Sequence, residues 1–252
     1  MELPKIYSQK QWERGGCLEQ HKKYIGKPYI SWSAVETWRK EKAFAPKPEF
    51  SYLTGKQAFL TRYCLGDNSY VSDSMIDFGT FGTETENYIC DRTDADKFEQ
   101  HERKVLDTIK PLGVFQREVI MPFRGFILIG YIDDMTLPDE KGNVELVRDY
   151  KTKSKSSKKD LHDVDKLQLD LYIGALQKEG LKVKRAEYCI IERLGGRECM
   201  QGKGRTVLSI GKEIWYEDYS YNNDTIKRAK DLVREAAKEI SEYWKVFKTL
   251  NK

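Results

Sequence analysis

The sequence lacks a long hydrophobic run. No stretch approaches the roughly 20 apolar residues that a membrane-spanning helix needs. Residues 1–10 also lack the basic and then apolar pattern of a secretory signal. These absences argue against a membrane or secreted protein and favour a soluble, cytoplasmic one.

Paired cysteines are also missing. The five cysteines are widely scattered and form no C-x-x-C pair, which argues against a zinc ribbon or a dithiol redox centre. We therefore expect reduced thiols with mostly structural roles. The cysteines are Cys17, Cys64, Cys90, Cys189 and Cys199.

An excess of one charge is absent from the chain as a whole. Lys and Arg number 44 and Asp and Glu number 40, which leaves a net charge of only +4. The overall charge therefore does not indicate a polyanionic partner. Locally, however, residues 151–160 read KTKSKSSKKD, a basic and polar stretch that predicts a loop.

The 252 residues, 39% of them hydrophobic, suffice for a single domain with one substantial core. Hydrophobic periodicity predicts a helix from Ala34, with Ser33 as its N-cap and Glu36 completing a capping box. Beyond this helix, the pattern predicts a helical region over 82–109, strands over 114–123, 125–133 and 144–151, a helix over 161–176 ended by Gly180, strands over 186–191 and 206–210, and a closing helix over 226–247.

This element order predicts an α/β (α+β) fold with a central mixed sheet of about five strands flanked by helices. We expect one domain over residues 1–252. It would comprise a helical N-terminal extension over 1–78, a core over 79–215 and a closing segment over 216–252 that carries the last helix.

Chemically active residue types gather at the ends of two expected strands. Asp149 and Lys151 are two residues apart, so their side chains share one face of a strand while Tyr150 points the other way. Asp133 ends the preceding strand, and a hairpin would bring it opposite or diagonal to Asp149. The competing interpretation is ordinary surface charge.

Two carboxylates held together repel each other, and a divalent cation removes that penalty. Magnesium prefers hard oxygen ligands and is often held by one or two carboxylates plus substrate phosphate oxygens. We expect Asp133, Asp149 and the backbone carbonyl of Tyr150 to bind Mg²⁺ or Mn²⁺. Lys151 would orient the attacking water or stabilise charge that develops on phosphorus.

Three short motifs follow one another along the chain: G-Y-I-D at 130–133, D-Y-K-T at 149–152 and Q-L-D-L-Y at 168–172. Together they resemble the signature of RecB-type nucleases in the PD-(D/E)xK superfamily. The resemblance implies a restriction-endonuclease-like core, metal binding by the two aspartates and a catalytic lysine. It further implies that Gln168 and Tyr172, which share one helix face, contribute to the site and to DNA contact.

A fourth motif resembles the first motif of lambda-exonuclease-like relatives. Gly82 and Glu86 form a G-x-x-x-E pattern, which implies that Glu86 is a third acidic ligand. The F-G-T triplet occurs twice here, so Gly79 is an alternative motif glycine and Glu84 an alternative ligand. An exposed helix glutamate without a functional role is the remaining interpretation.

Nucleic-acid contact is expected from the loop after the D-x-K motif. Its lysines could neutralise several phosphates without reading bases, although a solvated polar loop is the simpler interpretation. These residues are Lys153, Lys155, Lys158 and Lys159. Near the N-terminus, four aromatic residues could stack on unpaired bases or pack in the core; they are Tyr24, Tyr29, Trp32 and Trp38.

The resemblance implies a Mg²⁺- or Mn²⁺-dependent DNA nuclease, more often an exonuclease, in recombination, repair or phage DNA processing in a host cytoplasm. Single-stranded DNA or duplex ends would be its partner. A structure-specific endonuclease on the same fold and a non-catalytic nucleic-acid-binding module are the alternatives. Iron-sulfur relatives carry a late cysteine trio, whereas only Cys189 and Cys199 follow Tyr172, so no cluster is expected.

Overall fold

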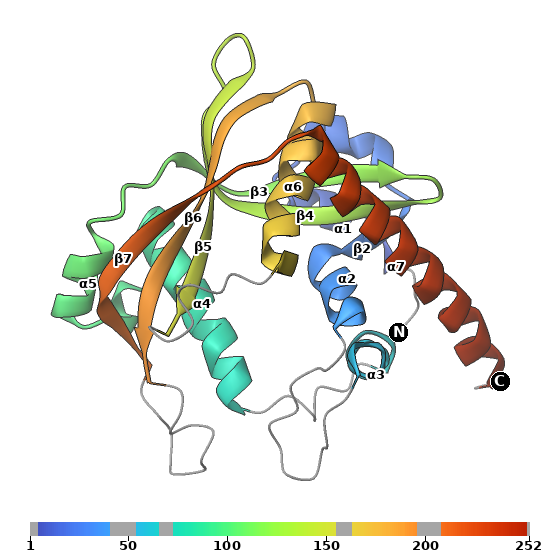
Figure 1. The fold of residues 1–252 in the computed structure, drawn as a ribbon, viewed down its shortest axis with the longest axis horizontal. Coiled ribbons are helices and arrows are strands. Elements are labelled where there is room, and N and C mark those ends of the chain that lie inside the picture. Colours follow the sequence, from blue (N-terminus) through green and yellow to red (C-terminus); the bar gives the residue numbers. More distant parts are fainter. Residues whose placement is uncertain (1–4, 41–53, 66–72, 155–162, 196–207, 251–252) are drawn as a thin grey trace.

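A computed structural model describes residues 5–40, 54–65, 73–154, 163–195 and 208–250 (Figure 1). The strands are β1 (Lys5–Ile6), β2 (Pro28–Ser31), β3 (Gly113–Phe123), β4 (Phe126–Thr136), β5 (Asn143–Lys153), β6 (Lys182–Leu194) and β7 (Ser209–Tyr219). The α-helices are α1 (Gln9–Arg14), α2 (Trp32–Arg39), α3 (Gly55–Phe59), α4 (Asp73–Asp91), α5 (Gln100–Leu106), α6 (Asp163–Lys178) and α7 (Asn223–Leu250). Short segments of other helix types are η1 (Glu19–Tyr24), η2 (Leu60–Cys64) and η3 (Ala95–Lys97).

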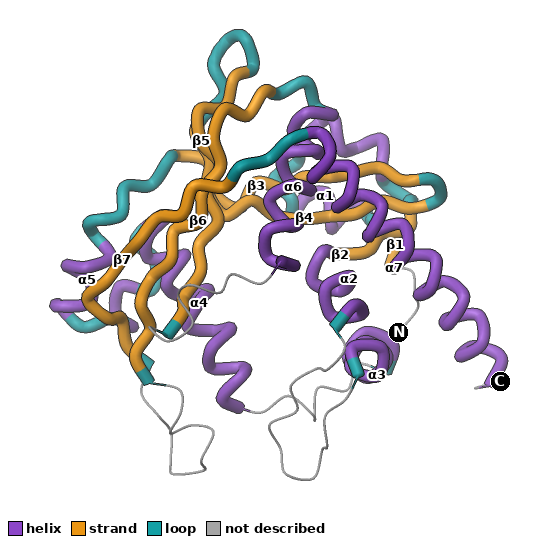
Figure 2. Tube along the Cα trace, in the orientation of Figure 1, coloured by secondary structure: helices purple, strands orange, loops and turns teal. Residues whose placement is uncertain are grey.

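The seven strands form one mixed sheet in the order β1-β2-β4-β5-β6-β7, and β3 pairs with the other edge of β4 (Figure 2). β4 is antiparallel to β3 and β5 and parallel to β2, while β5 and β6 run parallel. The parallel pair needs a crossover, and α6 supplies it between β5 and β6. The predicted fold class, a mixed sheet flanked by helices, is confirmed.

The strands predicted over 114–123, 125–133 and 144–151 correspond to β3, β4 and β5, whose β-branched and aromatic residues give a clear strand pattern. The estimate of about five strands was low, because β1 and β2 lie in the N-terminal region that was expected to be helical. Their two and four residues are too short to show an alternating pattern. The last strand prediction, over 206–210, was also too short, since β7 continues to Tyr219.

The N-cap of α2 is Ser31 and not Ser33, so the predicted capping box with Glu36 was wrong. The Ser31 hydroxyl accepts a hydrogen bond from the Ala34 backbone N–H at 3.3 Å, and the Ser33 hydroxyl lies 3.0 Å from that of Ser31. The earlier start places Trp32 in the helix, where it is buried together with Val35 on the same side.

The helical region expected from Gly82 begins earlier, at Asp73, and is divided in two. α4 ends at Asp91, and Arg92 and Asp94 then adopt positive φ angles of 64° and 60°. Left-handed residues cannot continue an α-helix, so the chain turns before α5 begins at Gln100.

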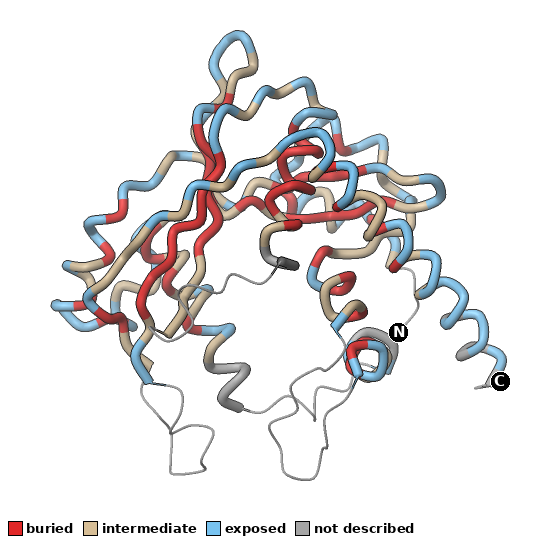
Figure 3. The backbone as a smooth tube through the Cα atoms, viewed as in Figure 1, coloured by how far each residue is buried: buried red, intermediate tan, exposed pale blue. Residues whose placement is uncertain are grey.

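Two large hydrophobic clusters lie against the sheet. One joins β3, β4, β5 and β6 to α2, α6 and α7, and the other joins α4 and α5 to β5, β6 and β7. Figure 3 shows that the buried residues gather along the central strands. Every α6 residue over 169–176 is buried, so this helix is fixed firmly against the sheet. Within the described ranges, no helix combines the length and the apolar character needed to cross a bilayer.

Candidate active site

β4 and β5 bring Asp133 and Asp149 into one site. The backbones of β4 and β5 pair at Asp134–Arg148 and at Met135–Val147. Continuing this antiparallel register by one residue brings Asp133 opposite Asp149. The Tyr150 backbone N–H then donates to Oδ2 of Asp133 at 2.9 Å. A carboxylate from one strand thus satisfies a backbone donor of the other and fixes the side chain of Asp133 beside β5.

Asp149 and Lys151 project together from β5, as their two-residue spacing predicted. Lys151 Nζ lies 2.5 Å from Asp149 Oδ2. The Asp149 side chain is 1% exposed and that of Lys151 is 24% exposed. The ammonium is therefore the more accessible member of a pair whose carboxylate is almost completely shielded from water.

Glu86 reaches the same site from α4. Burial raises the pKa of its carboxyl to about 7; the Lys151 ammonium opposes this rise and the Asp149 carboxylate adds to it. Burial, together with the charges of Asp149 and Glu86, holds the pKa of Asp133 well above its usual value. The three carboxyl groups and the amine therefore share one electrostatic environment.

The two glutamates near the G-x-x-x-E motif lie on different sides of α4. Residues two apart on a helix are separated by about 200°, so Glu84 and Glu86 cannot face the same site. α4 directs Glu86 toward Asp149. A Cβ atom on Gly82 would lie 3.9 Å from Oγ1 of Thr152, so this glycine faces β5 at the D-Y-K-T motif.

The donor set suits a hard divalent cation, since it consists of carboxylate oxygens whose mutual repulsion a cation would relieve. The structure does not hold a closed cage of protein ligands: among the described residues, no group of three or more His, Cys, Asp or Glu side chains is arranged to hold a metal ion. An open set fits Mg²⁺, which retains water molecules and recruits substrate oxygens.

α6 contributes Gln168 and Tyr172, which contact each other. The Gln168 side-chain amide donates to the Tyr172 hydroxyl at 2.6 Å. Burial raises the pKa of Tyr172, and the charges of Asp133 and Asp149 raise it further. The tyrosine thus remains a neutral phenol close to both aspartates.

Gly130 of the G-Y-I-D motif makes room for that tyrosine. A Cβ atom at Gly130 would lie 2.3 Å from Cε1 of Tyr172, closer than two non-bonded carbon atoms can approach. The G-Y-I-D and Q-L-D-L-Y motifs therefore meet through direct packing. The sequence shows both motifs but does not reveal this contact.

Sequence reasoning missed a polar network behind the site. Oδ2 of the buried Asp134 accepts hydrogen bonds from the Tyr150 hydroxyl and from the Leu112 N–H, both at 2.8 Å. Arg148 donates to Glu187 at 2.7 Å and to the Lys110 carbonyl at 2.8 Å. The alternation of Arg148 and Tyr150 with the site residues could have indicated it, because strand neighbours point to opposite faces.

Only some of the other predicted site residues lie in the described part of the chain. Lys153 is the last residue of β5 and is half-buried. Lys155, Lys158 and Lys159 lie outside the described residues. The Tyr150 carbonyl stays a predicted ligand.

A protein-family model matches most of this chain. The model of the PD-(D/E)XK nuclease superfamily matches residues 51–248, which is more than half of the chain and includes all four motifs. The chain belongs to this superfamily. PD-(D/E)XK enzymes are nucleases that generally use divalent metal ions such as Mg²⁺.

Two solved structures are similar to this PD-(D/E)XK chain at low identity. SSO0001 shares 13% identity with a TM-score of 0.42, over 88% of this chain and 82% of that protein. The "Putative exonuclease" from Eubacterium rectale shares 12% identity with a TM-score of 0.46, over 95% and 85%. No curated protein matches the chain. The family assignment rests on the superfamily model.

Proposed function

We propose that this chain is a Mg²⁺- or Mn²⁺-dependent deoxyribonuclease that hydrolyses phosphodiester bonds. The observation that supports the proposal is the convergence of Glu86, Asp133, Asp149 and Lys151 from α4, β4 and β5. Three carboxyl groups and one amine at a buried position are costly for folding, so a catalytic use explains them better than a structural one.

Asp133 and Asp149 would hold the metal ion, with Glu86 and the Tyr150 carbonyl as further oxygen ligands. When bound, the ion would polarise a phosphoryl oxygen and lower the pKa of a coordinated water. Glu86, with a pKa of about 7, can release its proton near neutral pH and then add a negative charge to the ligand set.

Lys151 would act on the phosphate itself. Its ammonium is fixed by Asp149 at 2.5 Å and remains partly exposed, so it can meet a phosphate oxygen without a large rearrangement. A positive charge fixed in advance stabilises the negative charge that develops in the transition state. Gln168 and Tyr172 would border the same site and contact the DNA strand from α6.

Substrate handling is proposed on the resemblance to RecB-type and phage exonucleases. Lys153, Lys155, Lys158 and Lys159 would contact the DNA backbone, and digestion from a single-stranded or duplex end would serve recombination, repair or phage DNA processing. A structure-specific endonuclease on the same fold is the second candidate. A non-catalytic binding module has no need for a buried Asp149 paired with a partly exposed Lys151.

Cleavage of end-labelled single-stranded, duplex and circular DNA with Mg²⁺ or Mn²⁺ tests the proposal. Asp149→Asn and Lys151→Ala should each lower the cleavage rate by about 100-fold or more, because each removes a charge that the transition state needs. Intact circles beside shortened linear substrates would indicate an exonuclease, and cut circles an endonuclease.

Glu86 and Glu84 offer a matched pair on one helix. Glu86→Gln should slow cleavage strongly, whereas Glu84→Gln should leave it close to the wild-type rate, since only Glu86 faces Asp149. Equal rates for wild type, Asp149→Asn and Lys151→Ala would show that the activity comes from a contaminant and would overturn the proposal.

A further inference from the structure

A concave site lies away from the carboxylates. A cavity of about 500 Å³ opens between β2, the β3–β4 hairpin, α2, α3 and α7. This volume is in the range of sites that bind small molecules or single groups of larger ones. None of the catalytic candidates lines it.

Aromatic rings form part of its wall. The rings of Phe123 and Phe126 are stacked, with centroids 4.9 Å apart and planes 3° from parallel. Both are half-buried, so parts of their surfaces remain accessible, and Tyr29 also lines the cavity. Flat apolar surfaces of this kind bind the faces of nucleobases without selecting among them.

Positive charge surrounds these rings. The lining residues include Lys5, Arg124, Arg234 and Lys238 and no aspartate or glutamate. The guanidinium of Arg234 lies 5.6 Å from the centroid of the Phe123 ring and is paired with Asp231 at 2.5 Å, so the charge that a ligand would meet comes mainly from the other three. A cavity with an aromatic wall and several cations matches a ligand that has a flat ring and a negative charge.

The cavity and the carboxylate site lie along one strand. β4 begins at Phe126, which lines the cavity, and carries Asp133 seven residues further on. At about 3.3 Å per residue, the two positions are separated by roughly 23 Å. A nucleic-acid strand held at one position could therefore extend to the other.

We propose that this cavity binds an unpaired nucleotide of a single-stranded DNA segment whose scissile phosphate lies at the carboxylate site. The base would pack against the Phe126 side of the stacked pair, and the flanking phosphates would meet Arg124 and Lys238. This inference rests on the proposed nuclease function and assigns a substrate-positioning site to it. A free nucleotide shares the same chemistry and is tested separately.

The test measures binding without cleavage, by fluorescence anisotropy of labelled oligothymidylate in the presence of a chelator. Phe126→Leu keeps an apolar side chain but removes the ring, and it should weaken binding by about 5-fold or more. Lys238→Ala should weaken binding and reduce the slope of log affinity against log salt by about 1.

Lys227→Ala is the matched control, because Lys227 is also an exposed lysine of α7 and lies about 16 Å from Lys238 along the helix. It should bind like the wild type. Lys238 is itself exposed, so its substitution leaves the fold intact. The proposal is overturned if Phe126→Leu and Lys238→Ala bind like Lys227→Ala, or if the wild type binds no oligothymidylate.

A competition experiment distinguishes a nucleotide within a DNA strand from a free nucleotide. An excess of longer unlabelled oligothymidylate should displace the probe while the same concentration of free thymidine monophosphate does not, and equal displacement by both would overturn the assignment to a DNA strand. A different result would contradict the nuclease proposal: metal-dependent cleavage that Asp149→Asn does not reduce. The binding measurements described above do not depend on that result.

Discussion

At the scale of single residues, Gly130 links two motifs through sterics. Its missing side chain admits the Tyr172 ring, which would lie 2.3 Å from an added Cβ atom. Gly130→Ala should destabilise the protein by about 1–3 kcal/mol, the usual cost of overpacking a core. It should also slow cleavage, because the displaced tyrosine borders Asp133. Urea unfolding and the cleavage assay measure both effects.

Gly82→Ala provides the comparison. Gly82 lies inside α4, and its added Cβ atom would have Thr152 Oγ1 at 3.9 Å as its nearest contact. Alanine in a helix interior is favoured over glycine by about 0.5–1 kcal/mol, so this variant should be slightly more stable than the wild type. If Gly130→Ala were equally stable, Tyr172 would not be fixed where the structure places it.

Residue spacing alone was sufficient to place Asp149 and Lys151 on one face, since that follows from strand geometry. It was also sufficient to pair Gln168 with Tyr172 across one helical turn. Which of Glu84 and Glu86 faces β5 depends on the rotation of α4 relative to β5. That rotation is set by tertiary packing, which a single sequence does not encode in any local pattern.

At the scale of elements, β5 is fixed by what lies behind it. Tyr150 points away from the site and donates to Asp134, whose Oδ1 has no partner among the described residues. Burial raises the pKa of Asp134, while hydrogen bonds from the Leu112 N–H and the Tyr150 hydroxyl lower it. β5 is therefore anchored through the carboxylate of Asp134, which accepts few hydrogen bonds. The loss of any one of them should matter.

Tyr150→Phe should destabilise the protein by about 1–3 kcal/mol, the cost of leaving a buried polar group with one donor fewer. Cleavage should fall as well, because Asp149 and Lys151 flank this residue. Tyr243→Phe on α7 is the control, since that tyrosine is exposed and its ring packs on Trp38. Thermal unfolding that shows equal losses in both variants would contradict the role of Asp134.

Long periodic elements were predictable and short ones were not. The 16 residues of α6 and the 11 residues of β4 repeat their hydrophobic pattern often enough to be recognised. β1 and β2 form because the partner edge of β4 is available, with Tyr29 paired to Ile127. Pairing of this kind depends on residues about 100 positions apart.

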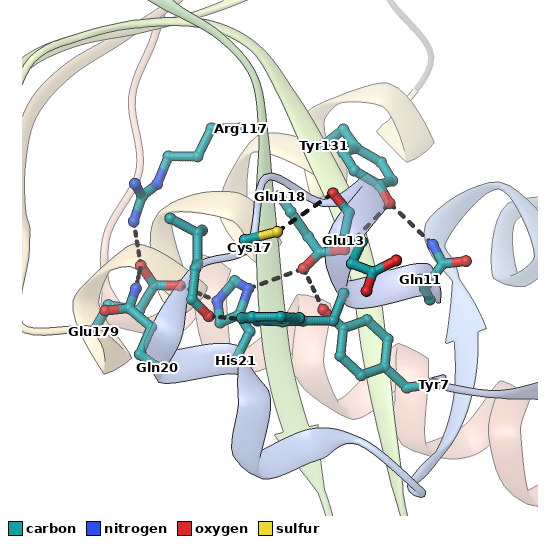
Figure 4. A network of polar contacts seen from close by, with 12 residues as sticks. Tyr7, Gln11, Glu13, Cys17, Gln20, His21, Arg117, Glu118, Tyr131 and Glu179 are labelled. Atoms are coloured by element: carbon teal, nitrogen blue, oxygen red, sulfur yellow. Dashed lines mark hydrogen bonds and ion pairs between the residues drawn. The ribbon is translucent and has the colours of Figure 1, made fainter. Parts of the chain in front are cut away.

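At the scale of the whole molecule, one buried network ties the N-terminal segment to the nuclease core (Figure 4). His21 of η1 lies 2.9 Å from Glu118 of β3 and 3.0 Å from Glu179, which follows α6. Tyr7 also donates to Glu118, at 2.6 Å, and Arg117 lies 2.5 Å from Glu179. Three distant parts of the chain therefore meet at one imidazole ring.

The charge of His21 should make the stability depend on pH. Burial lowers the pKa of His21, but the hydrogen bonds to Glu118 and Glu179 outweigh it and raise the pKa above its ordinary value. Only the protonated ring can donate to both carboxylates, since a neutral imidazole carries one N–H. The contribution is therefore complete below the unfolded pKa of about 6.5 and is lost as the pH rises through the raised folded pKa.

His21→Asn should consequently be less stable than the wild type at acidic pH, and the gap in free energy of unfolding should narrow as the pH rises past that window. Denaturant unfolding at a series of pH values measures this gap. His101→Asn is the control, because His101 is 68% exposed beside Glu99 and its substitution should produce little change at any pH. A gap for His21→Asn that stays constant with pH would mean that the ring holds the N-terminal segment by packing alone, without its charge.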